Sequence, residues 1–173
     1  KNKIDYICSA FDLVSLKFLC KYTKFPYFSI SSGEILTLDT LKFIKSKKVP
    51  IILSTGMASI KEINKTLNFL NYKKKNITLL HCVSSYPAKF EDLNLNFISI
   101  LKKKFKLPVG VSDHSHGYLT PIIAKSLGVT IIEKHVTMSR KLVGPDHKAS
   151  LTIKEFKHMI KLVRNTEKIL GQS

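Results

Sequence analysis

The chain has 173 residues, enough for one ordinary domain with a sizeable core. A hydrophobic content of 44% excludes a disordered chain, and no apolar run reaches the ~20 residues that a membrane-spanning helix needs. Three cysteines without a CxxC pair exclude a disulfide framework and favour a reducing, cytoplasmic compartment.

The net charge of +17 comes from 29 lysines and arginines against 12 acidic residues. Arginine occurs only at Arg140 and Arg164, and the lysines lie mostly in short runs such as 73–75 and 102–104. Proteins that read nucleic acids favour arginine for bidentate contacts, so this composition favours a solvated lysine surface. A positive field also attracts small anionic substrates. We therefore expect small-molecule partners, no nucleic acid and no membrane.

Short β-branched runs alternate along the chain with stretches of helical period. In chain order, each predicted strand is followed by a predicted helix. The predicted strands cover residues 4–8, 27–30, 50–53, 77–82, 108–112 and 129–133. The predicted helices cover residues 12–22, 38–46, 59–71, 94–105, 118–127 and 152–170, with a loop of about fifteen residues before the last. Asp12 is a predicted N-cap, and Ser59 and Glu62 form a predicted capping box.

Six βα units with nearly continuous apolar strands imply a parallel sheet covered by helices, an α/β fold. A doubly wound open sheet and a (β/α)₈ TIM barrel, present as a partial barrel of about six βα units, are the competing architectures. Polar residues follow every predicted strand, and in a barrel these ends converge on one mouth. No GxGxxG or GxxxxGK[ST] motif supports a nucleotide-binding open sheet. The pattern therefore favours the barrel.

His114 and His135 follow the fifth and sixth predicted strands. Neighbouring parallel strands lie ~4.8 Å apart, so the two imidazoles can reach one ion. Glu133 shares the strand face of His135, and Asp146, in a Gly-Pro-Asp-His turn, can reach the same mouth. Two imidazoles with oxygen ligands suit Mn²⁺, Fe²⁺ or Zn²⁺. Alternatively, each histidine only caps a carbonyl or satisfies a buried partner, and His116 is a weaker competing ligand.

Hydroxyl groups follow three predicted strands, at Ser9, Ser32 and Ser112. They can bind a phosphate or carboxylate together with helix N-termini, although helix capping is the commoner role of such residues. Tyr86 is either a sugar-facing platform or a loop-packing residue. Cys82 follows an apolar strand and is predicted to be a small core residue rather than a nucleophile.

Several short segments occur in order, at spacings compatible with successive βα units. They read SGE at 32–34, IILSTGMA at 51–58, LLHCVSSYP at 79–87, VGVSDH at 109–114, IEKH at 132–135 and GPDH at 144–147. With these motifs the chain resembles the sialic acid synthase (N-acetylneuraminate synthase) family, which includes legionaminate and pseudaminate synthases. The resemblance extends over essentially the whole chain.

The resemblance implies a transferase that condenses phosphoenolpyruvate with an N-acetylated aminosugar, either N-acetylmannosamine or a 2,4-diacetamido hexose. The products are a nine-carbon 2-keto acid and phosphate. It further implies that His114 and His135 bind Mn²⁺, with Mg²⁺ or Co²⁺ as alternatives, and that this ion polarises the sugar aldehyde. The resemblance places catalytic carboxyl groups at Glu133 and Asp146. It places substrate-binding residues at Ser9, Ser32, Glu34, Ser84, Tyr86 and Ser112.

This sequence departs from the family pattern at several of these positions. Ser29 stands where the family usually has a lysine that pairs with phosphoenolpyruvate, and losing such a pair could cost on the order of several kcal/mol. Either another lysine substitutes, or the activity is weak or absent. Ser84 replaces an asparagine of some members and Ser9 replaces a threonine.

Length is the larger departure. The family barrel begins with two further βα units, and full-length members carry a C-terminal antifreeze-like domain and form homodimers. Residues 1–173 are thus expected to be a partial TIM-barrel synthase domain that is inactive alone, and full turnover by these residues would contradict this. One alternative is a related synthase that joins phosphoenolpyruvate to an aldose phosphate, although only Arg140 is available near the strand ends for a second phosphate. Another is a catalytically silent fragment or basic binding module.

Overall fold

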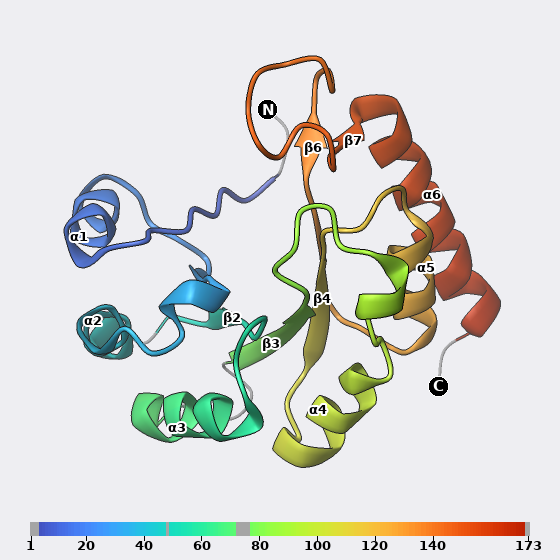
Figure 1. The fold of residues 1–173 in the computed structure, drawn as a ribbon. Helices are drawn as coiled ribbons and strands as arrows, with labels where there is room; N and C mark the ends of the chain where they lie inside the picture. Colours follow the sequence, from blue (N-terminus) through green and yellow to red (C-terminus); the bar gives the residue numbers. More distant parts are fainter. Residues whose placement is uncertain (1–3, 48, 72–76, 172–173) are drawn as a thin grey trace. The chain divides into compact units, whose positions relative to one another are not determined.

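The computed structural model describes residues 4–47, 49–71 and 77–171 (Figure 1). The lysine run at residues 73–75, which is predicted to lie on a solvated surface, lies outside the described residues. The chain divides into two compact units, Lys1–Leu79 and Leu80–Ser173, which are considered in turn. Hydrogen-bonded neighbours in the main sheet follow the order β1-β2-β3-β4-β5. A doubly wound sheet reverses its order at a switch point, so this consecutive order favours the barrel type.

The first unit alternates helices and short strands as predicted. Its elements are α1 (Leu13–Tyr22), β1 (Phe28–Ile30), η1 (Ser32–Glu34), α2 (Leu38–Lys47), β2 (Ile51–Ser54) and α3 (Ile60–Leu70). Strands β1 and β2 are parallel, with Phe28 opposite Ile51. The predicted N-cap is confirmed, because the Asp12 carboxylate accepts a hydrogen bond from the Ser15 N–H at 2.8 Å. The capping box at the start of α3 is confirmed as well.

The predicted strand at residues 4–8 is wrong. Residues 4–10 have no regular secondary structure, and the side chains of Ile4 and Tyr6 are 82% and 61% exposed. A run of β-branched and aromatic residues forms a strand only where a neighbouring strand completes its hydrogen bonds and a core covers its side chains. Within the described part of the first unit this segment has neither.

Strand β3 (Ile77–Cys82) runs into the second unit, where its last residues are buried. The elements that follow are η3 (Phe90–Asp92), α4 (Phe97–Phe105), β4 (Val109–Asp113), α5 (Leu119–Ser126), β5 (Ile132–Lys134), β6 (Val136–Thr137), β7 (Leu151–Thr152) and α6 (Ile153–Leu170). Strands β4 and β5 are parallel, and α5 and α6 lie side by side (Figure 1). The fully buried core of this unit includes Leu80, Ile98, Leu101 and Val109.

The segment after β5 is more ordered than predicted. The short strands β6 and β7 lie before and after the predicted loop, and they pair in parallel with Val136 opposite Leu151. The Thr152 hydroxyl and Glu155 form a capping box at the start of α6. This short ladder closes the base of the loop that carries Asp146. None of the helices in the described ranges is long and apolar enough to cross a membrane.

Candidate active site

His114 lies directly after β4 and is held on two sides by the loop that follows β3. Its Nδ1 lies 2.7 Å from the carbonyl oxygen of Val83, and its own carbonyl accepts a hydrogen bond from the Ala88 N–H at 3.0 Å. Between these two anchors the loop places the Tyr86 ring against the imidazole, with ring centroids 4.1 Å apart. The loop therefore fixes both the position and the orientation of the His114 ring.

His135 follows β5 and stands next to His114. The two ring centroids are 5.5 Å apart and the rings are nearly perpendicular, at 82°. Tyr86 also contacts His135, with centroids 5.6 Å apart. The His135 carbonyl accepts a hydrogen bond from the Leu151 N–H at 2.9 Å, so the first residue of β7 anchors this position. The ends of two parallel strands thus place two imidazoles side by side, and the loop after β3 adds the phenol of Tyr86.

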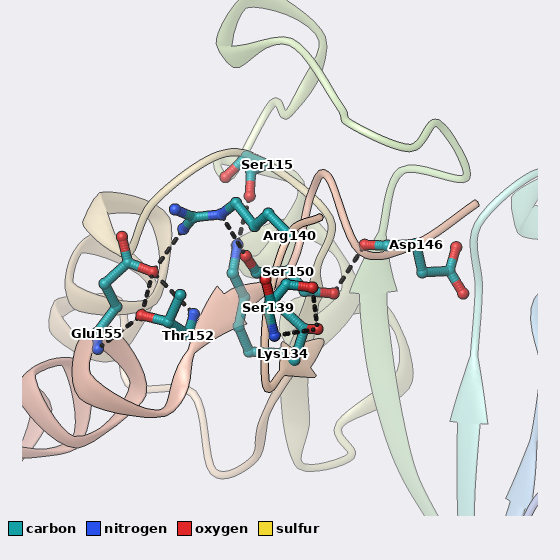
Figure 2. A network of polar contacts seen from close by, with 9 residues as sticks. Ser115, Lys134, Ser139, Arg140, Asp146, Ser150, Thr152 and Glu155 are labelled. Atoms are coloured by element: carbon teal, nitrogen blue, oxygen red, sulfur yellow. Dashed lines mark hydrogen bonds and ion pairs between the residues drawn. The ribbon is translucent and has the colours of Figure 1, made fainter. Parts of the chain in front are cut away.

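Asp146 reaches the same place from the long loop between β6 and β7. Its Oδ2 lies 3.7 Å from His135 Nδ1. The Asp146 carbonyl accepts hydrogen bonds from the N–H and hydroxyl groups of Ser150, at 3.1 and 2.7 Å. Figure 2 shows the Asp146 carboxylate pointing away from this anchor. The backbone of the loop is therefore tied down beside β7 while the carboxylate stays available to His135.

Arg140 fastens the other side of this loop. Its Nε donates to the Ser150 carbonyl at 3.0 Å, and its Nη2 pairs with Glu155 at the start of α6 (Figure 2). The Arg140 guanidinium and the N–H and hydroxyl of Thr152 hold the pKa of Glu155 down to about 2. Sequence reasoning missed this network, although the Thr-x-x-Glu pattern at 152–155 is a readable capping-box signal.

Glu133 and Ser112 lie opposite each other in the β4–β5 register, on the strand residues that precede the two histidines by two positions. Burial raises the pKa of Glu133, and the Ser112 hydroxyl and His135 oppose this only in part. A raised pKa increases the protonated fraction of this carboxyl group at neutral pH. Glu133 is thereby suited to hold or donate a proton beside the histidines.

Burial also lowers the pKa of His114, and the neighbouring His135 adds to the effect. The ring is then neutral near pH 7, and its Nδ1–H donates to the Val83 carbonyl. This tautomer leaves the lone pair on Nε2, which lies 3.4 Å from the Ser112 hydroxyl. A backbone carbonyl that fixes one ring nitrogen is the usual support of a metal-binding histidine.

The donor chemistry of this cluster fits a divalent ion of the Mn²⁺ type, with two imidazoles and a carboxylate near one of them. Among the residues that the structure describes, no group of three or more His, Cys, Asp or Glu side chains is placed so that it could hold a metal ion. An ion held by His114 and His135 would therefore complete its shell with water or substrate oxygens. His116, the competing ligand, is exposed.

Burial, with smaller effects of Cys82 and of the Asp146 and Glu133 carboxylates, raises the pKa of Tyr86. Its hydroxyl therefore stays protonated and can donate a hydrogen bond. Ser84 lies in the same loop and is half-buried. Cys82 is buried, as predicted for a core residue.

The remaining predicted site residues belong to the first unit. Ser9 lies in the irregular segment before α1, and Ser32 and Glu34 form the ends of η1. The Glu34 Oε2 atom is buried without a hydrogen-bond partner among the described residues, and so is the Ser31 hydroxyl. Buried polar atoms in native proteins are nearly always paired, so an orphaned carboxylate oxygen indicates a missing ligand or water.

Comparison with solved structures establishes the class of this protein. The chain is similar to the crystal structure of an N-acetylneuraminic acid (sialic acid) synthetase from Leptospira borgpetersenii serovar Hardjo-bovis in complex with citrate. The TM-score is 0.88 and the sequence identity is 37%. The match covers 94% of this chain and 57% of that one. The predicted fold class, an α/β protein of the TIM-barrel type, is thereby confirmed.

The NeuB family matches residues 1–173, and the chain belongs to this family. It is 44% identical over 174 residues to the N,N'-diacetyllegionaminic acid synthase of Campylobacter jejuni, a match that covers 99% of this chain and 52% of the relative. It is 31% identical over 169 residues to the human N-acetylneuraminate-9-phosphate synthase, covering 97% of this chain and 47% of the relative. The predicted resemblance to sialic acid synthases is confirmed, and the chain spans about half the length of these curated relatives.

Proposed function

We propose that this chain is the part of a sialic acid-type synthase that holds its two histidines, and that the whole protein condenses phosphoenolpyruvate with an N-acetylated aminosugar. C3 of phosphoenolpyruvate forms a bond to the aldehyde carbon of the open-chain sugar. Water then adds at C2, and phosphate leaves, so that a nine-carbon 2-keto acid results. The observation that carries the proposal is the meeting of His114, His135, Tyr86 and Asp146 around the ends of β4 and β5.

His114 and His135 would hold a divalent ion, with Mn²⁺ as our choice over Mg²⁺ or Co²⁺. When bound, the ion supplies Lewis-acid polarisation of the sugar carbonyl. The Val83 carbonyl keeps Nε2 of His114 unprotonated for this task. Asp146, 3.7 Å from His135, orients that ring or accepts a hydrogen bond from a sugar hydroxyl.

Glu133 would hold the proton that the new hydroxyl group needs, because its burial favours the protonated form. Tyr86 offers its ring and a protonated hydroxyl to the sugar. We assign Glu34 to the sugar as well, because its orphaned Oε2 calls for a hydrogen-bond donor such as a sugar hydroxyl. Ser84, beside Tyr86 in the loop, would bind the same substrate.

Ser112 would contact the phosphoenolpyruvate anion, since its hydroxyl lies between the Glu133 carboxyl and the His114 ring. By the family resemblance, Ser9 and Ser32 would bind the same anion. Hydroxyl donors suit a phosphate or carboxylate oxygen, but they supply no charge. The replacement of the family lysine by Ser29 therefore predicts weak binding of phosphoenolpyruvate.

The experiment incubates the full-length protein with Mn²⁺, phosphoenolpyruvate and either N-acetylmannosamine or a 2,4-diacetamido hexose. We expect phosphate and a 2-keto acid to form in equal amounts with one of these sugars. The variants His114→Ala and His135→Ala should lose Mn²⁺ binding and product formation. His116→Ala is the matched control, since it removes an exposed histidine two residues from His114. Mn²⁺ binding without any phosphate release would contradict the proposal.

A synthase for a phosphorylated aldose is the second candidate, because the human relative is named for a phosphorylated product. Such an acceptor needs a cation for its second phosphate. Arg140, the nearest arginine in the sequence, is already bound to Glu155 and the Ser150 carbonyl. We therefore expect N-acetylmannosamine 6-phosphate to be a poorer substrate than the unphosphorylated sugars, and the reverse order would favour this second function.

A further inference from the structure

A buried ion pair joins β4 and β5 between the residues of the candidate site. Lys134 Nζ lies 2.6 Å from Asp113 Oδ2, and the two side chains are 1% and 0% exposed. Asp113 and Lys134 are register partners in the β4–β5 ladder. Asp113 stands between Ser112 and His114, and Lys134 stands between Glu133 and His135. Each member of the pair is therefore the residue that directly precedes one of the two histidines in the sequence.

All strong polar groups of the pair have partners. Asp113 Oδ1 accepts hydrogen bonds from the N–H and hydroxyl of Ser115, at 2.9 and 2.7 Å. The Ser115 hydroxyl also shares a hydrogen bond of 2.8 Å with Thr120 in α5. Lys134 Nζ donates to the Ser115 carbonyl (Figure 2) and also to Asp113 Oδ2. The network ties the ends of β4 and β5 to the first turn of α5.

We propose that Asp113 and Lys134 are a positioning pair, which fixes the separation of His114 and His135. The inference rests on the proposed function in taking the two histidines as metal ligands. Side chains alternate along a strand, so the pair points away from the face that carries Ser112, His114 and Glu133. A buried charge keeps its partner because an unpaired one is strongly disfavoured. The register of the two strand ends, and with it the spacing of the rings, is thereby locked.

Metal sites are sensitive to this kind of support, since partners that orient a ligand are worth about 10- to 100-fold in metal affinity when removed. The rings are 5.5 Å apart in the structure. A shift of either strand end would change this spacing without touching any ligand. The pair is buried, and it therefore acts on the ion through the backbone and not as a ligand.

The test uses the full-length protein and the double variant Asp113→Leu/Lys134→Met, which replaces the ion pair with apolar groups. Such replacements of buried ion pairs are often neutral or stabilising, so this variant is expected to fold. We expect Mn²⁺ affinity, measured by electron paramagnetic resonance of the free ion, to fall about 10- to 100-fold. The crystal structure without metal should show an altered His114–His135 spacing. Asp113→Asn/Lys134→Gln, which removes both charges and keeps a side-chain oxygen that can accept the hydrogen bonds from Ser115, gives a second measurement if the apolar double variant does not fold.

Lys125→Met is the matched control, because it breaks the Lys125–Glu167 ion pair of 2.8 Å between α5 and α6 and leaves β4 and β5 untouched. It should leave Mn²⁺ affinity within about twofold of the starting protein. Unchanged ring spacing and Mn²⁺ affinity in Asp113→Leu/Lys134→Met, or in Asp113→Asn/Lys134→Gln, would overturn the positioning role. If the starting protein binds no Mn²⁺, the proposed function fails, and the metal-free ring spacing still decides the role of the pair.

Discussion

Gly110, the second residue of β4, has no room for a side chain, and Gly110→Ala tests how closely the strands pack. A Cβ at this position would lie 2.5 Å from Leu80 Cδ2, 2.6 Å from the Ile131 carbonyl oxygen and 2.9 Å from Ile131 Cβ. Real Cβ contacts essentially never fall below 3.0 Å, so at least two neighbours must move. One of them is backbone, which cannot rotate away as a side chain can.

The size of the effect follows from what would have to move. Leu80 is fully buried, and adding a methylene group to a well-packed core costs about 1–3 kcal/mol. The Ile131 carbonyl also accepts the Val111 N–H at 2.9 Å, a bond worth about 1 kcal/mol that a shift would weaken. We therefore expect Gly110→Ala to lower the free energy of unfolding by about 3 kcal/mol. Because Ile131 leads directly into β5, the variant should also weaken Mn²⁺ binding.

The measurement is urea unfolding followed by circular dichroism, where the midpoint should fall while the denaturant slope stays constant. Gly33→Ala is the matched control, since its added Cβ meets nothing within 4 Å and its φ lies outside the left-handed region. That variant should change stability by less than about 0.5 kcal/mol. A loss below about 0.5 kcal/mol for Gly110→Ala as well would refute the packing argument.

Two further predictions concern charge. The hydrogen bond from Arg140, with those from Thr152, holds the pKa of Glu155 at about 2 against an ordinary 4.5, so its stabilisation is complete above pH 4.5 and is lost as the pH falls through 2. At about 1.4 kcal/mol per pKa unit the shift amounts to about 3 kcal/mol, and screening of this 35% exposed side chain reduces the stabilisation to about 1 kcal/mol. The urea midpoints measured at pH 5.5 and at pH 2.5 should therefore differ more in the starting protein than in Glu155→Gln. Equal differences in the two proteins would contradict this. Ser29→Lys should lower the KM for phosphoenolpyruvate about tenfold or more by restoring a cation to β1, whereas an unchanged KM would show that another residue has taken over this role.

The helices of this chain could be predicted because local signals agree with packing. In α3 the capping box fixes the first turn, and Ile63, Thr66 and Leu70 recur at helical spacing on the buried face. The strand predicted at residues 4–8 failed for the opposite reason. Its pattern is locally correct, but a strand depends on neighbours that its own residues do not specify. The same dependence hid β6 and β7, whose two-residue ladder leaves no periodic signal.

The candidate site divides along similar lines. The closeness of His114 to His135 could be predicted, because it follows from the spacing of parallel strands, a general property of the backbone. The contact of His114 with Val83 and the stacking of Tyr86 depend on the path of the loop, and no residue pattern encodes that path. The Arg140–Glu155 pair joins residues fifteen positions apart, so it could not be read before β6 and β7 were placed.

Two tripeptides on neighbouring strands, Ser112-Asp113-His114 and Glu133-Lys134-His135, show how one sequence pattern serves both chemistry and stability. Their outer residues lie on one strand face, and their hydroxyl, imidazole and carboxyl groups are the ones proposed to bind ligands. Their middle residues face the other way and neutralise each other in a buried, fully hydrogen-bonded pair. In a chain with 29 basic residues, Lys134 differs from a solvated lysine because its ammonium is buried and bound. Substituting Asp113 and Lys134 should therefore change the positions of the outer residues, His114 and His135 above all. Substituting a solvated lysine of the surface should leave these positions unchanged.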